Sequence, residues 1–317
     1  MDTKKLVDPE ILPLIEVFPT YQFSALGIDT VREQSEAMVK AMPPVSIEDV
    51  SVREELIDNG TSHQVRVLVY APKDDNASRP ALLHIHGGGF VIGTPEMNDA
   101  RNQTLSNELG AVIVSVDYRL APEHQFPLPV EDCYTALKWL FENASAFGVD
   151  KNRIGIYGES GGGGLSAALA ILARDRKEVQ IAHQFLIYPM LDDRTCVGND
   201  ANPYTGEFIW TRESNHFGWS SLLGKEPGSG DVSPYAAAAR VDSVVGLPPT
   251  YICAGALDLF LDEDIRYAHR LLKAGVPTEL HIYPGAFHAF DMAPDAEISK
   301  QFQLDFIRAL KKALVTG

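Results

Sequence analysis

The sequence is poor in cysteine and in positive charge. Its three cysteines, Cys133, Cys196 and Cys253, are odd in number and stand far apart, so they imply no disulfide framework. Each is therefore expected to be a small buried hydrophobic residue rather than a nucleophile. Lysine and arginine together number 27 against 43 acidic residues, which gives a formal net charge of −16. That balance argues against nucleic acid or anionic lipid as a partner.

Long apolar runs are also missing. No stretch of about 18 apolar residues occurs, and the first ten residues, MDTKKLVDPE, lack the apolar run of a signal peptide. We therefore expect a cytoplasmic protein without stable membrane association. Internal repeats and low-complexity segments are not visible either. The 317 residues, 45% of them hydrophobic, suit one large α/β domain with an appended piece.

The apolar patterns that are present predict a mostly parallel sheet flanked by helices. Val52–Ile57 and Val65–Tyr70 alternate in the manner of an antiparallel edge pair. From Ala81 onward the strands are near-continuous apolar runs, which is typical of a sheet covered on both faces. Strands and helices then alternate, which indicates right-handed parallel crossovers. The expected strands are 81–85, 111–116, 154–157, 181–188, 250–254 and 279–283, and the expected helices are 102–109, 130–141, 165–172, 262–274 and about 296–315.

A candidate nucleophile lies between one of these strands and the following helix. Residues 158–162, GESGG, fit the pattern G-x-S-x-G with Ser160 at its centre. Chance matches to three fixed positions are common in glycine-rich loops, but a strand before and a helix after the pattern favour a strained turn that exposes the serine hydroxyl. The run is not a dinucleotide or phosphate loop, because G-x-G-x-x-G would need glycine at 160 and no Gly-Lys-Ser/Thr ending follows.

A serine nucleophile needs a histidine base and an acid that orients it. Where the serine lies on a strand-to-helix turn of this kind, the acid and then the histidine follow it along the chain. His288 lies in a loop directly after a strand, where a mobile base is expected, and His216 is the weaker alternative. Asp258 directly follows the strand at 250–254 and is the expected acid. Asp192 and Asp193 follow the preceding strand and remain an alternative acid position. His183, His269 and His281 are expected to be packing or surface residues, and Asp262 is expected to cap a helix. Asp117 precedes the serine and is excluded by chain order.

Backbone donors for an oxyanion are expected in two places. Residues 86–90, HGGGF, follow a buried strand and present bare N–H groups, as the HGGG-type loop of esterases does. Gly88 and Gly89 are therefore expected to act together with the N–H of Gly161. His84 and His86 could suggest metal ligation, but no third ligand is evident, so neither a metal nor another cofactor is expected.

Two segments are candidates for a cap over the active site. Residues 1–45 are predicted as helices, with Asp8-Pro9 opening the first and a capping box at Thr30–Glu33 opening a helix that runs through Met42. Residues 192–239 contain no predicted strand and are rich in aromatic residues. The alternative for residues 1–45 is a helical layer packed on the sheet, and the alternative for the aromatic residues of 192–239 is a small satellite core. If they form a cap, the side chains expected to contact substrate are Phe18, Tyr21, Phe208, Trp210, Phe217 and Trp219.

Together these motifs resemble the bacterial hormone-sensitive-lipase family (family IV) of α/β-hydrolase esterases, from about Ala81 to Phe290. The matching stretches are HGGGF at 86–90, DYRLAPEH at 117–124, GESGGG at 158–163, LIYPMLD at 186–192, LPPTYICAGALDLFLDED at 247–264 and GVPTELHIYPGAFHAF at 275–290. The resemblance implies an α/β-hydrolase fold with a catalytic domain at 46–191 and 240–317 and a cap built from 1–45 and 192–239. It also implies a serine carboxylesterase that uses a Ser160, Asp258 and His288 triad and an acyl-enzyme intermediate. Its expected substrates are small-molecule esters with short to medium acyl chains and small alcohols.

The chain departs from the family pattern in a few places. Members usually carry Asp and Ala around the serine, where this sequence has Glu159 and Gly161. Glu159 is expected either to contact the cap or the HGGG loop or to be a solvated surface carboxylate. The acid motif Asp-Leu-Phe-Leu-Asp at 258–262 replaces the commoner Asp-Pro-Leu, a change that leaves the acid intact and can reshape its loop.

Several alternatives stay open at this stage. The same residues suit another acyl hydrolase, such as a lactonase, thioesterase, amidase or small peptidase. A receptor that binds ligand without hydrolysis can lose its histidine, whereas His288 is present. The family often forms homodimers through its last strand, here Glu279–Tyr283, although any half-buried strand shows the same alternation.

Overall fold

The computed structural model describes residues 3–18, 23, 27–74, 78–195, 197–198 and 201–315. One eight-stranded sheet has the strand order β1-β2-β4-β3-β5-β6-β7-β8. The strands are β1 (Val50–Asp58), β2 (Gln64–Pro72), β3 (Arg79–Ile85), β4 (Val112–Asp117), β5 (Val149–Glu159), β6 (Gln184–Ile187), β7 (Thr250–Gly255) and β8 (Thr278–Tyr283). Strand β2 is antiparallel to its neighbours β1 and β4, and the other described pairs are parallel. The predicted antiparallel edge pair and parallel body are therefore confirmed.

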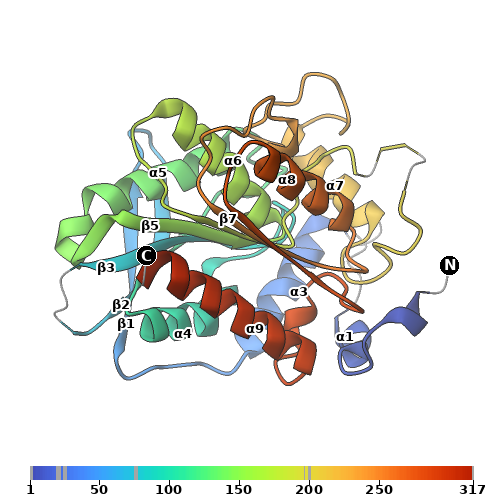
Figure 1. Cartoon of the computed structure of the whole chain (residues 1–317), viewed down its shortest axis with the longest axis horizontal. Coiled ribbons are helices and arrows are strands. Elements are labelled where there is room, and N and C mark those ends of the chain that lie inside the picture. Colours follow the sequence, from blue (N-terminus) through green and yellow to red (C-terminus); the bar gives the residue numbers. More distant parts are fainter. Residues whose placement is uncertain are drawn as a thin grey trace.

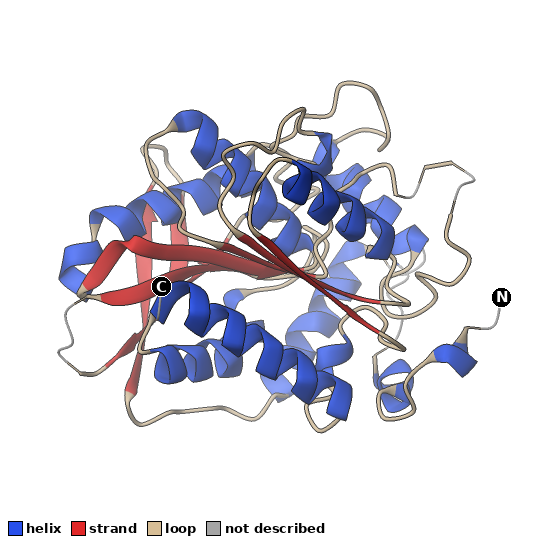
Figure 2. Ribbon diagram, viewed as in Figure 1, coloured by secondary structure: helices blue, strands red, loops and turns tan. Residues whose placement is uncertain are grey.

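Helices cover both faces of the sheet (Figure 1, Figure 2). One face carries α5 (Leu128–Glu142), α6 (Gly161–Arg176) and α8 (Leu261–Lys273), and the other carries α4 (Asp99–Leu109) and α9 (Glu297–Leu310). The shorter helical segments are η1 (Lys4–Leu6), η2 (Pro95–Asn98), η3 (Ala144–Phe147), η4 (Ala238–Arg240), η5 (Phe290–Met292) and the π-helical η6 (Lys311–Val315). Across the described ranges, no helix has both the length and the apolar character needed to cross a membrane.

Strand β3 shows why the central strands are continuous apolar runs. All seven of its residues are buried. Ala81, Leu83 and Ile85 belong to the core on the α5 and α6 face, whereas Leu82 belongs to the core that holds Phe302 of α9. Because successive side chains point to opposite faces, a strand covered on both faces carries apolar residues toward both, and the buried polar side chain of His84 has hydrogen-bond partners.

The first helices begin at residues other than those predicted. Helix α1 (Leu12–Val17) has Ile11 as its N-cap, so the predicted start at Asp8 and Pro9 is wrong. The Asp8 carboxylate instead accepts a hydrogen bond of 2.9 Å from the Glu10 N–H and closes the preceding turn. Pro13 lies in the first turn of α1, where an N–H would have no intrahelical acceptor, so it does not break the helix.

Helix α3 (Ile28–Ala41) begins after Gly27, two residues before the predicted capping box. Thr30 is therefore inside the first turn, and the capping-box prediction is wrong. Gly27 has φ +77°, a conformation that a side chain would disfavour, and this glycine sets the helix start. The end of the helix agrees with the prediction to within one residue.

The described residues of the insertion at 192–239 contain no strand, as predicted, and they include helix α7 (Arg212–Leu223). The Thr211 side chain caps this helix by accepting a hydrogen bond of 3.3 Å from the Ser214 N–H. Two cysteines also behave as predicted, because Cys133 and Cys253 are buried and unpaired. Cys196 lies outside the described residues.

Candidate active site

The predicted strained turn is present between β5 and α6. Ser160 has φ +55° and ψ −120°, which is rare for a residue with a side chain and turns its hydroxyl away from the sheet. The flanking glycines are required by close backbone approach. A Cβ on Gly158 would lie 2.6 Å from the carbonyl oxygen of Ile85, and a Cβ on Gly162 would lie 2.7 Å from the carbonyl carbon of His86.

Three predicted side chains meet at the end of this turn. His288 Nε2 lies 2.9 Å from Ser160 Oγ, and His288 Nδ1 lies 2.8 Å from Asp258 Oδ2. The other oxygen of Asp258 accepts a hydrogen bond of 3.0 Å from the Phe260 N–H. Since a carboxylate can only accept, Nδ1 carries the hydrogen, and in the neutral imidazole Nε2 is free to accept the serine proton. All three side chains are buried, with 0% of Asp258, 5% of His288 and 6% of Ser160 exposed.

The alternative acids and base have partners elsewhere. Asp192 accepts from Arg194 at 2.7 Å, and Asp193 accepts from Arg240 at 2.7 Å. His216 lies in α7 and contacts the Glu226 carboxylate at 2.8 Å. None of these contacts involves Ser160.

The remaining histidines and aspartates also lie away from the serine. His183 directly precedes β6, His269 is in α8 and His281 is in β8. Asp117 pairs with Arg66. Asp262 is the second residue of α8, whose N-cap is Phe260, so the prediction that Asp262 caps this helix is wrong.

The glycine loop (His86–Phe90) lies against the serine turn. Gly88 and Gly89 have φ of +109° and +56°, and a Cβ built on Gly161 would lie only 3.0 Å from the Gly89 nitrogen. Within the described ranges, no hydrogen bond occupies the N–H groups of Gly88 and Gly89. Gly161 is the first residue of α6, where an N–H has no acceptor in its own helix. Backbone donors from both loops are therefore available close to Ser160.

His84 and His86 have separate partners. His86 donates from Nδ1 to the Gly87 carbonyl at 2.8 Å and stacks on Tyr118 with ring centroids 4.2 Å apart. Burial lowers the pKa of His86 to about 4, so this imidazole is neutral at physiological pH. His84 hydrogen-bonds to Ser115 at 2.7 Å and to Glu159 at 3.0 Å.

Glu159 is buried, so its interpretation as a surface carboxylate is wrong. Only 5% of the residue is exposed, and its carboxylate hydrogen-bonds to His84, Asn98 and Arg101, each at 3.0 Å. Burial alone would raise the pKa of this carboxyl, but His84 and Arg101 outweigh burial and hold the pKa below its usual value. Glu159 is therefore an ionised group beneath the serine turn.

Aromatic residues from both predicted cap segments cover the glycine loop. A Cβ on Gly89 would strike the ring of Trp210, which also lies 6.4 Å from the His288 ring. The Trp210 indole donates to Asn215 at 3.1 Å. Phe23 lies 6.0 Å from Trp210 and stacks on Phe217 at 4.7 Å. Phe23 and the insertion thus pack together beside the serine.

The other predicted contact residues are placed differently. Phe208 packs on Phe287 with centroids 5.6 Å apart. Trp219 has 0% exposure and packs on Phe90 at 5.1 Å, so it is a core residue in this structure. Phe18 is half-buried, at the C-cap of α1. Tyr21 lies outside the described residues.

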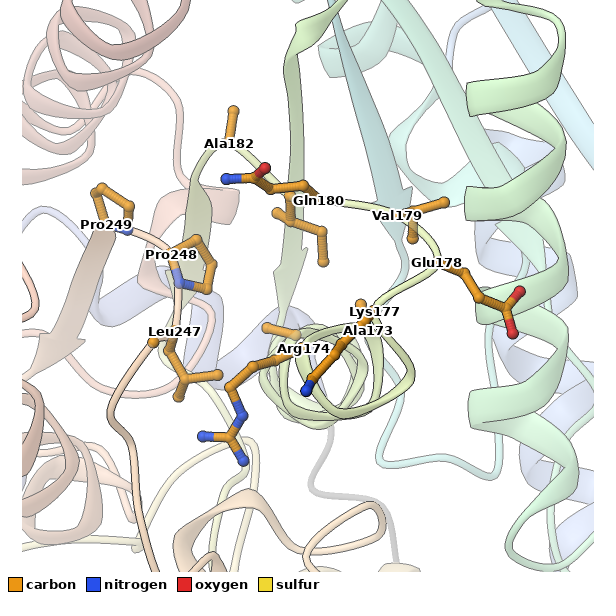
Figure 3. A pocket seen from close by; sticks show the side chains of 13 residues that line it. Ala173, Arg174, Lys177, Glu178, Val179, Gln180, Ala182, Leu247, Pro248 and Pro249 are labelled. Carbon is orange, nitrogen blue, oxygen red and sulfur yellow. The ribbon is translucent and has the colours of Figure 1, made fainter.

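A cavity of about 510 Å³ lies away from this site, at the C-terminal end of α6. Figure 3 shows Arg174 and Lys177 of this end facing Leu247 and Pro248. Ser160 precedes the N-terminal end of the same helix. The cavity is therefore separate from the candidate active site.

Sequence reasoning missed three residues next to the predicted ones. Tyr188 and Phe260 pack on the His288 ring at 4.9 and 5.2 Å. Arg101 binds Glu159, although nothing in its local sequence distinguishes it from a surface arginine. Tyr188 and Phe260 lie within matching stretches of the family resemblance, which was the available signal.

Fold and site together define an α/β hydrolase. The sequence matches the α/β-hydrolase fold family over residues 82–292. Esterase LipI of Mycobacterium tuberculosis is 31% identical over 91% of this chain and 89% of its own. An arylesterase of Saccharolobus solfataricus is 30% identical over 91% of this chain and 93% of its own.

Solved structures give the same result. A bacterial heroin esterase has a TM-score of 0.92 and 37% identity over 98% of this chain and 99% of its own. An esterase of Pyrobaculum calidifontis has a TM-score of 0.83 and 33% identity over 96% and 98% of the two chains. The chain belongs to the α/β-hydrolase fold family, among the carboxylesterases of the hormone-sensitive-lipase family, and is a carboxylic ester hydrolase.

Proposed function

We propose that this protein hydrolyses short- to medium-chain acyl esters through an acyl-enzyme formed on Ser160. The observation that carries the proposal is the hydrogen-bonded series from Ser160 Oγ through His288 to Asp258, with distances of 2.9 and 2.8 Å. A base in contact with the hydroxyl and an acid in contact with the base are what an activated serine needs. The unoccupied N–H groups of the glycine loop lie beside it.

In the first step, His288 Nε2 takes the proton of the Ser160 hydroxyl while Oγ attacks the ester carbonyl carbon. Asp258 holds the Nδ1–H and stabilises the imidazolium that forms. The carbonyl oxygen becomes an oxyanion. Its donors are the N–H groups of Gly88, Gly89 and Gly161, and each such donor is worth roughly 3–4 kcal/mol of barrier in acyl transfer.

The oxyanion then collapses, and the bond to the alkoxide breaks. The His288 imidazolium gives its proton to the departing alkoxide, which leaves as an alcohol and leaves an ester between the acyl group and Ser160. Water is next deprotonated by His288 and attacks this acyl-enzyme. The carboxylic acid is released and the serine regains its proton.

A cap over the site would limit the size of the substrate. We assign residues 1–45 and 192–239 to it, and 46–191 with 240–317 to the catalytic domain. This assignment is supported by two contacts between the segments, the Phe23–Phe217 stack and a hydrogen bond of 2.9 Å from the Thr3 N–H to Glu207. The Trp210 ring lies directly over Gly89, which restricts the space for an acyl or alkyl group there.

The names of the relatives agree with small or aromatic ester substrates, since they include an arylesterase and a heroin esterase. Cytoplasmic location and lack of nucleic-acid or membrane partners stay predictions. A homodimer through β8 (Thr278–Tyr283) also stays a prediction, and the position of this strand at the sheet edge is compatible with it.

The test is the hydrolysis of p-nitrophenyl esters from acetyl to dodecanoyl by the wild type and by Ser160→Ala. We expect a maximum of kcat/KM at short or medium chains and a loss on the order of 10⁴- to 10⁶-fold in the variant. Ser166→Ala is the matched control, because this buried hydroxyl of α6 donates to the Gly162 carbonyl and not to His288.

Two outcomes would contradict the proposal. Near wild-type turnover by a folded Ser160→Ala protein would remove this serine from the mechanism. Background hydrolysis of the whole series by the wild type would indicate another acyl leaving group, or a protein that binds without hydrolysis.

A further inference from the structure

A chain of polar contacts, buried except at the partly exposed Arg101, joins the strand before the nucleophile to the loop that carries the base. It begins at Glu159, the residue before Ser160. The Glu159 carboxylate accepts a hydrogen bond of 3.0 Å from Arg101. A second nitrogen of the same guanidinium donates to Asp291. Glu159 and Asp291 are 5% and 6% exposed. One arginine of α4 therefore bridges two buried carboxylates from β5 and from η5.

The chain continues from Asp291 to the base. The other oxygen of Asp291 accepts a hydrogen bond of 2.8 Å from the Tyr188 hydroxyl. The Tyr188 ring packs edge-on against the His288 imidazole, with centroids 4.9 Å apart and planes at 67°. Tyr188 is 4% exposed, and its hydroxyl is therefore held by Asp291 and not by water.

The backbone of Tyr188 is also constrained. It directly follows β6 with φ +35°, which a residue with a side chain rarely adopts, and its N–H donates to the Cys253 carbonyl at 2.7 Å. Phe260 also packs edge-on against the imidazole, at 5.2 Å. The base thus contacts two aromatic rings in addition to its hydrogen bonds, and the Tyr188 ring is anchored through Asp291 and Arg101.

We propose that Tyr188, Asp291, Arg101 and Glu159 act as one set of positioning residues that keeps the base in line with the serine. None of them contacts the substrate or the reacting atoms in this scheme. The inference rests on the proposed function, because it gives the set a role only if Ser160 and His288 react. Loss of one link should lower kcat by misplacing the base and should leave KM nearly unchanged, since substrate binding does not depend on it.

The link to test first is the Tyr188 hydroxyl. Removal of Arg101 would leave two buried carboxylates without their shared cation, and such a variant can fail to fold. Tyr188→Phe keeps the ring against His288 and deletes only the hydrogen bond to Asp291. We expect its kcat on p-nitrophenyl butyrate to fall about tenfold, with KM within about twofold of the wild type.

Tyr283→Phe is the matched control. Tyr283 is similarly buried at 6%, and its hydroxyl donates to another carboxylate, that of Asp305, at 3.2 Å. This variant loses the same kind of bond without loosening a ring on His288. It should lower stability to a similar extent and leave kcat unchanged. Wild-type kcat in both tyrosine variants, or equal losses of kcat in both, would overturn the inference.

A double-mutant cycle separates one connected set from independent packing effects. Asp291→Asn weakens the next link, and the Tyr188→Phe/Asp291→Asn double variant should lose no more kcat than the worse single variant. Additive losses would overturn the inference. Ser160→Ala in the same assay separates failure of the inference from failure of the proposed function. Activity without Ser160 would refute the proposed function itself. Activity that depends on Ser160, together with wild-type kcat in Tyr188→Phe, would refute only the positioning role.

Discussion

A methyl group added at Gly162 should be far more harmful than one added at its neighbour Gly161. Both residues lie in the first turn of α6 with helical backbone, so intrinsic propensity alone would favour alanine by up to about 1 kcal/mol at either position. The difference lies in what the new Cβ meets. At Gly162 it would lie 2.7 Å from the His86 carbonyl carbon, and it would overlap the Ile85 carbonyl oxygen more closely still.

The magnitude follows from that overlap. Carbon atoms in contact are normally about 3.5–4.0 Å apart, and the Ile85 oxygen is closer than the His86 carbon, so the end of β3 must move by about 1 Å or more to admit the methyl group. The obstacle is backbone of a central strand, which cannot turn away as a side chain can. We expect Gly162→Ala to lower the free energy of unfolding by about 3 kcal/mol. Since His86 opens the glycine loop, kcat should fall roughly 10²-fold or more as its donors shift.

Gly161→Ala is the control. Its Cβ would lie 3.0 Å from the Gly89 nitrogen, a tight contact that a shift of a few tenths of an ångström relieves. Denaturant unfolding and kcat on p-nitrophenyl butyrate would be measured for both variants. We expect Gly161→Ala to change stability by less than about 1 kcal/mol and to stay active. A Gly162→Ala protein as stable and active as Gly161→Ala would refute the argument from backbone approach.

Two further predictions concern the acid and the pocket. Asp258→Asn should lower kcat roughly 10⁴-fold by disturbing the histidine tautomer, while Asp192→Asn should leave kcat near the wild-type value; the reverse result would mean that Asp192 is the acid. Trp210→Leu should move the maximum of kcat/KM toward longer acyl chains, because it removes the ring that covers the glycine loop. Trp219→Leu changes the buried core and should lower the thermal midpoint without moving that maximum. If Trp219→Leu moved the maximum and Trp210→Leu did not, our placement of the acyl pocket beside Trp210 would be wrong.

The sheet was predictable because its signal is local. Each central strand needs apolar side chains on both faces, and the run Ala81–Ile85 shows this without knowledge of its neighbours. Strand β6 was predicted too long, at 181–188, and is Gln184–Ile187. Its C-terminal limit comes from the positive φ of Tyr188, a conformation that nothing in a tyrosine signals.

The N-terminal helix starts were not predictable for a related reason. A capping box is a sequence pattern, but α3 is fixed by its tertiary contacts. Arg32 of this helix donates to the carbonyls of Val91 and Ala121, both at 2.9 Å, beyond the end of the glycine loop. With its second turn anchored there, the helix begins at Gly27 and the side chain of Thr30 is not needed as a cap.

That Ser160, Asp258 and His288 meet could be predicted, because chain order and strand ends restrict their positions. The partners of Glu159 could not, since Arg101 is 58 residues away in sequence and His84 is 75 residues away. No short-range pattern links residues at such separations. What the sequence did show was a departure from the family at this position, Glu in place of the usual Asp.

That departure has a physical consequence. Aspartate is one methylene shorter, which would withdraw the carboxylate by about 1.5 Å. The hydrogen bonds to His84, Asn98 and Arg101 are all 3.0 Å long, and polar contacts much beyond 3.5 Å no longer count as hydrogen bonds. An aspartate at 159 would therefore lose direct contact with most of these donors unless they moved toward it. The longer side chain and the arginine of α4 fit each other, and this pairing extends a charged link from β5, which ends next to Ser160, to the segment that follows His288.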